Sequence, residues 1–233
     1  MFKIKNAVIA ISLATSAFSM SAMADTVYGS NFGTGSTYLT TLNGVATTFS
    51  ATSGSNAGTF TTKSQAGYTG AGVAGGGTLE INPNEAIKGS FAAPLTISNF
   101  TLGLLFDGPE YGDVNEVAQI TATYADSSVH VFTFTATGPT TAAWTGGGSF
   151  VNLSSATNGL GAVWSVSDPF SGASVTSLSF TALPGTVGSA GGTGSSQSDF
   201  VLISVSAVPE NETYAMMLAG LGLMGFVARR RSV

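Results

Sequence analysis

The stretch that decides the fold is EVAQITATY at residues 116–124, followed by SVHVFTFTAT at residues 128–137. In the first segment Ala118, Ile120, Ala122 and Tyr124 alternate with glutamine and threonines. Successive side chains of a β-strand point to opposite faces, so this pattern predicts a strand with one apolar face. Phenylalanine and threonine alternate in the second segment in the same way. The polar link at 125–128 predicts a turn, which makes the whole stretch a β-hairpin.

Similar short apolar segments lie on both sides of this hairpin, at residues 26–32, 45–50, 77–81, 95–106, 148–153, 161–167, 173–183 and 199–207. About ten strands separated by Gly, Ser, Asn and Pro turns predict an all-β, antiparallel β-sandwich of the jelly-roll type. In the last segment Val201, Ile203, Val205 and Ala207 are expected to share one buried face. Two glycine-rich stretches, 67–77 and 185–198, are predicted to be long surface loops.

The composition indicates a folded, exported protein. Charged residues make up 8% of the 233 residues, against about 25% in ordinary soluble domains, while Ser and Thr supply 60 residues. The apolar residues recur at strand spacing, which a disordered chain would lack. There is no cysteine, which excludes thiolate chemistry and disulfides. Residues 25–207 hold ten acidic residues and two lysines, a net charge of -8 that would repel nucleic acid.

The N-terminus has the pattern of a secretory signal peptide. Lys3 and Lys5 precede an apolar stretch at residues 7–18, and small side chains follow at Ala22 and Ala24. This order of basic, apolar and small residues predicts removal by signal peptidase after Ala24. The apolar stretch is shorter than the roughly 20 residues that a permanent membrane helix needs. Residues 1–24 are therefore predicted to be a signal peptide.

The C-terminus has an apolar run with a basic stop. Residues 214–228 carry no charge, and Arg229, Arg230 and Arg231 follow directly. At about 1.5 Å per residue, a helix of this length falls short of a bilayer core of about 30 Å. A basic cluster stays on the cytoplasmic side, so the chain before Thr213 would lie outside. The run predicts a transmembrane helix that is a poor permanent anchor.

These C-terminal features together resemble a known sorting signal. Val208, Pro209 and Glu210, the apolar run and the three arginines are similar, in content and order, to the PEP-CTERM signal of Gram-negative bacteria. The resemblance implies recognition by an exosortase at the inner membrane and release or transfer to the cell surface. Asn211 departs from the second proline that is usual in the motif. Residues 208–233 are therefore predicted to be the sorting signal, and residues 25–207 the β-sandwich domain.

Little in the domain points to catalysis. The pattern G-x-G-x-x-G at residues 70–75 lacks the helix that a phosphate-binding turn requires, so it is interpreted as part of a loop. His130 is the one histidine of the chain, and no G-x-S-x-G nucleophile elbow is present. The sequence therefore predicts a protein that is not an enzyme. A glycoside hydrolase, which needs a spaced pair of carboxylates, is the weakest alternative.

Two candidate binding sites remain. The acidic stretch FDGPEYGDVNE could place several hard oxygen ligands around Ca²⁺, although a solvated acidic loop is the simpler interpretation. The candidate ligands are Asp107, Glu110, Asp113, Asn115 and Glu116. For a sugar, the candidate stacking rings are Trp144 and Tyr111, whereas Trp164 alternates with apolar neighbours and is expected in the core. No other cofactor is predicted.

The signal peptide predicts a secreted protein, and the resemblance to the PEP-CTERM signal implies exosortase processing and a place on the cell surface or in an exopolysaccharide matrix such as a biofilm. Its role there is expected to be structural or interactive. The alternative is a carbohydrate-binding β-sandwich module. The expected partners are signal peptidase, exosortase, the inner membrane during export, and exopolysaccharide.

Overall fold

The computed structural model describes residues 24–75, 77–108, 114–154, 162–186, 198–208, 220–222 and 224. Within these ranges the domain is all-β, with fourteen strands and one short 3-10 helix, η1. The elements are β1 (Asp25–Tyr28), η1 (Gly29–Asn31), β2 (Thr37–Leu42), β3 (Val45–Ser53), β4 (Asn56–Ala57), β5 (Thr59–Gln65), β6 (Tyr68–Ala74), β7 (Glu85–Gly103), β8 (Asn115–Tyr124), β9 (Val129–Gly138), β10 (Thr141–Trp144), β11 (Ser149–Asn152), β12 (Trp164–Ser167), β13 (Ser174–Thr186) and β14 (Val201–Val208).

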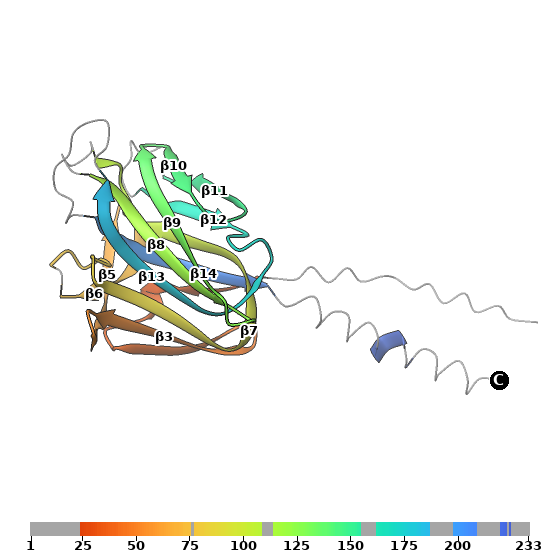
Figure 1. Cartoon of the computed structure of the whole chain (residues 1–233). Helices are drawn as coiled ribbons and strands as arrows, with labels where there is room; N and C mark the ends of the chain where they lie inside the picture. The colour runs from red at the N-terminus through yellow and green to blue at the C-terminus, as the bar shows by residue number, and fades with distance from the viewer. Residues whose placement is uncertain are drawn as a thin grey trace, which may run out of the picture.

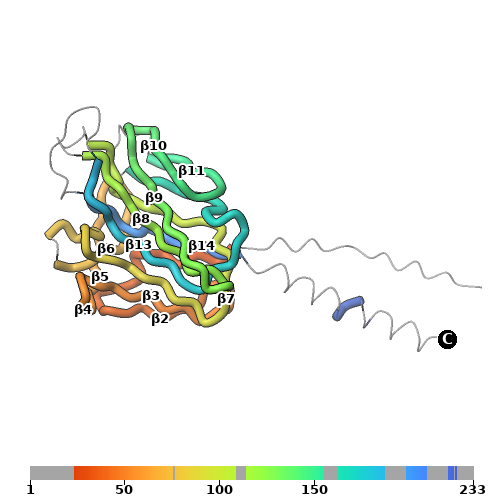
Figure 2. The backbone as a smooth tube through the Cα atoms, viewed as in Figure 1, coloured from red at the N-terminus to blue at the C-terminus, as the bar shows by residue number. Residues whose placement is uncertain are grey.

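The strands form two antiparallel layers that share the long strand β7 (Figure 1). The first part of β7, residues 85–91, pairs with β3 on one side and β13 on the other. Its last part, residues 96–103, pairs with β12 and β14, and the start of β13 also reaches Leu95 and Thr96. Between them Ala92, Ala93 and Pro94 are exposed, and Pro94 cannot donate a backbone hydrogen bond. The strand therefore passes from one layer to the other at this point, as the tube in Figure 2 shows.

The core lies between the layers and is rich in aromatic rings. Phe100 of β7 meets Phe180 of β13 edge to face, with ring centroids 5.6 Å apart. Phe134 of β9 packs on Trp164 of β12 across the same space. Such pairs contribute about 1 kcal/mol each beyond the burial of their area. One large cluster of buried residues therefore stabilises the whole sandwich.

The hairpin predicted at residues 116–137 is confirmed. Strands β8 and β9 pair antiparallel, with Val117 opposite Thr135 and Thr123 opposite Val129. Ala118, Ile120 and Ala122 are fully buried, as their alternation predicts. A second hairpin, β2–β3, was missed. Its turn is Asn43–Gly44, where both φ angles are positive, as a two-residue type I′ turn requires.

The glycine-rich stretch 67–77 is not a loop, so that prediction is wrong. Residues 68–74 form strand β6, which pairs along its whole length with β5. Glycine is needed because other segments lie against the strand: a Cβ on Gly70 would stand 2.5 Å from the Val201 side chain. The stretch 77–81 was predicted to be a strand, but it only bridges through Ile81 to Phe200. The G-x-G-x-x-G pattern lies mostly in β6, and no helix follows it.

The last strand, β14, lies in the sheet as predicted, but its side chains do not share one face. Leu202 is opposite Leu102 and Ser204 is opposite Thr101, so Ile203 is an extra residue that forms a β-bulge. The bulge reverses the alternation. Val205 and Ala207 face the main core, whereas Val201 packs in a smaller cluster with Ile203 against it.

The fold class is thus confirmed as an all-β, sandwich-like arrangement of antiparallel strands, and the jelly-roll type stays a prediction. Residues 1–23, most of the glycine-rich stretch 185–198 and Pro209 onward, apart from 220–222 and 224, lie outside the described residues. Those four C-terminal residues are helical. In the part of the chain that the structure describes, no helix has the length and apolar character needed to cross a membrane.

Candidate functional site

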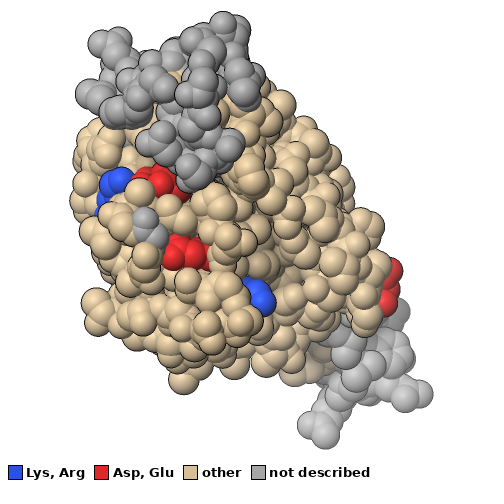
Figure 3. All heavy atoms as spheres, turned by 60° about the vertical axis from the view of Figure 1, so that its left-hand side comes forward, with Lys and Arg blue, Asp and Glu red and all other residues tan. Residues whose placement is uncertain are grey.

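A cluster of three buried carboxylates and one half-buried lysine lies at one end of the sandwich. Lys63 comes from β5, Glu80 from the segment that joins β6 to β7, Glu85 from the start of β7, and Asp199 from the residues before β14. Figure 3 shows how few charged side chains interrupt the otherwise uncharged visible surface. Three of the ten acidic residues of the domain, Glu80, Glu85 and Asp199, are buried in this cluster. The cluster was not predicted from the sequence.

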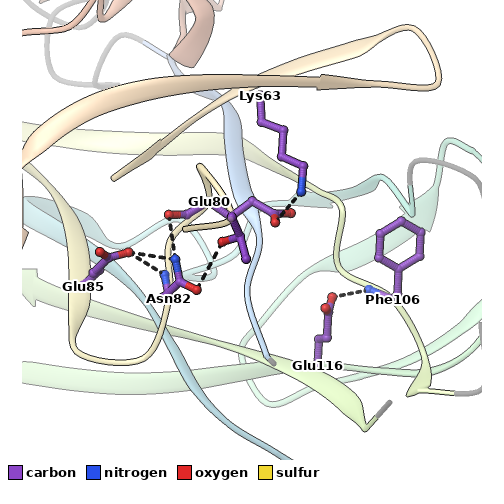
Figure 4. Close-up of polar contacts among 7 residues, drawn as sticks. Lys63, Glu80, Asn82, Glu85, Phe106 and Glu116 are labelled. Carbon is purple, nitrogen blue, oxygen red and sulfur yellow. Dashed lines mark hydrogen bonds and ion pairs between the residues drawn. The ribbon is translucent and has the colours of Figure 1, made fainter. Parts of the chain in front are cut away.

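Glu80 is the centre of this cluster (Figure 4). Its Oε2 atom accepts a hydrogen bond from Lys63 Nζ at 2.6 Å, in an ion pair whose glutamate side chain is 4% exposed and whose lysine side chain is 29% exposed. Next to it, Asn82 donates from its backbone and its side chain to Glu85 Oε2, at 2.9 and 3.0 Å. Thr78 donates to Asn82 Oδ1. These bonds fix the path of residues 77–85.

Burial raises the pKa of Glu80 from 4.5 to about 7. The negative charge of Asp199 raises it further, and together these effects outweigh Lys63, which lowers it. Between pH 4.5 and 7 the folded protein therefore holds a proton on Glu80 that the unfolded chain releases. The stabilising contribution of this proton is fully present below pH 4.5 and is lost as the pH rises through 7.

We expect the free energy of unfolding to fall by about 2 kcal/mol as the pH rises from 5 to 7.5. The folded protein loses the Glu80 proton over this range, and each pKa unit between the unfolded and folded states corresponds to about 1.4 kcal/mol. Urea unfolding at several pH values measures this slope. Glu80→Gln should flatten it. The control, Asp126→Asn, should keep it, because the pKa of Asp126 is ordinarily 3.8 and hydrogen bonds from the Ser128 side chain and backbone lower it further. An unchanged slope in Glu80→Gln would contradict the assignment.

Two residues of the predicted calcium site make hydrogen bonds within the connection between β7 and β8. Glu116 Oε2 accepts a hydrogen bond from the backbone N–H of Phe106 (Figure 4), and Asn115 Oδ1 accepts one from Gly108 at 3.2 Å. Asp107 and Glu116 are buried. Glu110 and Asp113 lie outside the described residues. Among those that are described, no three His, Asp or Glu side chains group as metal ligands, and calcium binding stays a prediction.

The predicted sugar-stacking ring Trp144 is not a free surface ring. It is half-buried, its indole N–H donates to the Gly147 carbonyl at 2.7 Å, and it packs against Phe100 and Phe132. The interpretation as an exposed ring is corrected, because the chain after β10 folds back over the indole edge. Tyr111 lies outside the described residues. Trp164 is in the core, as expected.

His130 is exposed at the start of β9, where it stacks on Tyr124 with ring centroids 4.2 Å apart. Its Nε2 atom is 3.1 Å from the Ser128 hydroxyl. The same hydroxyl donates to Asp126 Oδ1 at 2.6 Å, so the serine lies between the carboxylate and the imidazole. In a catalytic triad the histidine holds the middle position, so this arrangement belongs to the β8–β9 turn. It is consistent with a structural histidine.

The two ends of the domain lie beside each other. β1 begins at Asp25, directly after the predicted cleavage position Ala24, and β14 ends at Val208, the first residue of the predicted sorting signal. The strands pair antiparallel, with Asp25 opposite Ala207. Ala22, Pro209, Glu210 and Arg229 to Arg231 lie outside the described residues.

The C-terminal part of the chain matches a known family model. A family model described as the PEP-CTERM protein-sorting motif matches residues 207–231. The match includes Val208, Pro209 and Glu210 and the three arginines, so it covers the residues on which the sequence resemblance depends. Searches of curated proteins and of solved structures found no match.

Proposed function

Because the chain is a PEP-CTERM domain-containing protein, whose motif implies export and exosortase-dependent sorting to the cell surface, we propose that its β-sandwich is a non-enzymatic passenger with a structural or binding role there. The motif implies that an exosortase is the partner that processes the chain. The proposed site of action is the cell surface or the exopolysaccharide outside it. The route includes removal of residues 1–24 and a temporary anchor formed by the C-terminal run.

The observation that carries this proposal is the position of the motif relative to the fold. The matched region starts at Ala207 and the last strand ends at Val208, so almost the whole motif follows the sheet. Cleavage beyond Val208 would leave every strand of the described domain intact. Pro209 also favours an extended conformation at the residue before it, which suits a protease substrate.

The proposal predicts that the double substitution Pro209→Ala and Glu210→Ala blocks sorting. In the native bacterium the variant should accumulate in the cell envelope with its C-terminus uncut, and its amount in the surface and medium fractions should fall at least several-fold. The matched control is Glu212→Ala, which removes a nearby carboxylate outside the Val-Pro-Glu triplet. Immunoblots of the separated fractions measure the distribution. Equal distribution of the double variant and the wild type would contradict the proposal.

A further inference from the structure

The start of the sorting motif is tied to the beginning of the domain. β1 and β14 pair from Asp25 opposite Ala207 to Tyr28 opposite Ser204. The hydroxyl groups of Thr26 and Ser206 are also 2.8 Å apart. On its other side β14 pairs with β7, where Val208 is opposite Thr96. The first two residues of the matched motif are therefore held in the sheet.

One residue from a third strand pair contacts both of these ends, through its side chain and its backbone. Asn43 lies in the β2–β3 turn, and its Nδ2 donates a hydrogen bond to the Ala207 carbonyl at 2.6 Å. Its backbone N–H donates to Asp25 Oδ2 at 2.9 Å. The left-handed conformation of Asn43, with φ of 51°, places both donors at the same end of the sandwich. Asparagine and glycine adopt this conformation most readily.

These contacts decide how much of the sorting segment a protease can reach. A protease binds its substrate as an extended chain through backbone hydrogen bonds, as in strand addition to a sheet. The backbone of residues 204–207 is paired with β1, and Ala207 is fully buried. Ala207 and Val208, the first two residues of the matched motif, are therefore not free to bind a protease in this way while β14 stays paired.

We propose that Asn43 is a positioning residue for C-terminal processing: it holds Ala207 and Val208 in the sheet and so limits how close to the domain the sorting protease can engage the chain. The effect of Asn43 on processing in the cell rests on the proposed function. The effect of Asn43 on the pairing of β14 does not, because it can be tested in the protein alone. A role limited to turn formation would affect β2 and β3 and leave β14 unchanged.

The structural part is tested by hydrogen exchange of the full-length protein in detergent micelles. Asn43→Gly keeps a residue that accepts positive φ and removes the side-chain donor. We expect the amides of residues 205–208 to exchange about tenfold faster, as the loss of one hydrogen bond in a locally opening strand implies. Amides of the β8–β9 hairpin should keep their rates. Unchanged exchange at 205–208, or an equal increase in both regions, would overturn the proposal.

The matched control is Asn84→Gly. Asn84 also has a positive φ, of 73°, and its side chain makes no hydrogen bond to another described residue. The substitution makes the same chemical change away from the chain ends. We expect it to leave exchange at residues 205–208 at the wild-type rate. Faster exchange there in Asn84→Gly would show a general effect of the substitution and overturn the role of Asn43.

The cellular part is tested by pulse-chase labelling in the native bacterium. Asn43→Gly should shorten the half-time of C-terminal processing several-fold relative to wild type and Asn84→Gly. An equal or longer half-time would overturn the positioning role. In cells without the sorting protease none of the three proteins should be processed. Processing that persists there would contradict the proposed function, whereas the exchange experiment would still decide on Asn43.

Discussion

Replacing Gly72 with alanine is expected to destabilise the domain by about 3 kcal/mol or more, as overpacking against fixed backbone does. A Cβ on Gly72 would stand 2.2 Å from the Leu79 carbonyl oxygen and 2.6 Å from the Glu80 Cα. That segment cannot easily move away. Val73 donates a backbone hydrogen bond to Glu80, and Ile81 donates one to Phe200. The clash would have to break one of these contacts.

The matched control for Gly72 is Gly35→Ala. A Cβ on Gly35 would meet its nearest atom, the Thr37 carbonyl oxygen, at 3.4 Å, and its φ is not positive. We expect this change to alter the free energy of unfolding by less than about 1 kcal/mol. Urea denaturation followed by tryptophan fluorescence measures both variants. Similar stabilities for the two variants would show that residues 77–81 do not lie against β6 as described.

Replacing Trp164 with alanine is expected to cost about 4 kcal/mol of stability. Its side chain is 1% exposed and lies against Phe134, and its indole N–H donates to the Leu105 carbonyl at 2.9 Å. The change would leave a cavity between the layers and a buried carbonyl without this donor. Trp164 is the largest fully buried side chain among the described residues.

Trp144→Ala is the matched control for Trp164, because the same side chain is removed from a half-buried position. Its cost should be roughly half as large, since less surface returns to water. Thermal or urea unfolding, followed by circular dichroism, compares the two. If Trp144→Ala were the more damaging change, the assignment of Trp164 to the centre of the core would be wrong.

The parts of the fold that follow from strict alternation could be predicted from the sequence. The β8–β9 hairpin is an example, because its apolar face is continuous from Ala118 to Ala122 and its turn is polar. The Asn43–Gly44 hairpin carried a strong signal as well, since Asn-Gly favours a type I′ turn. It was missed because the threonines of β2 and β3 leave little apolar contrast.

Other features depend on contacts between distant segments. Glycines in β6 resemble a loop in sequence, yet they are required because Val201 and Leu79 lie too close for a Cβ. The bulge at Ile203 cannot be seen in the alternation of β14, because it arises from pairing with β7. Likewise, Glu80 and Lys63 become partners only when β5 and the segment before β7 meet.

The candidate sites also differ in whether they depend on a local sequence pattern or on contacts between distant segments. The sorting signal could be predicted because it is a local sequence pattern, and the family model matches the same residues. The exposure of Trp144 could not be predicted from the sequence, because it depends on packing against Phe100 and Phe132, and sugar binding stays a prediction. The buried cluster around Glu80 had one signal in the sequence, the rarity of lysine: Lys63 is one of two lysines between residues 25 and 207.

The most direct test of the central claim is the mass of the mature protein from the native bacterium, with and without its sorting protease. The account predicts that protein from cells with the protease begins at Asp25 and ends after Val208 but before the apolar run at residue 214. Without the protease, the chain should retain its C-terminus through Val233. A mature surface protein that keeps residues 214–233 in cells with the protease would contradict the account.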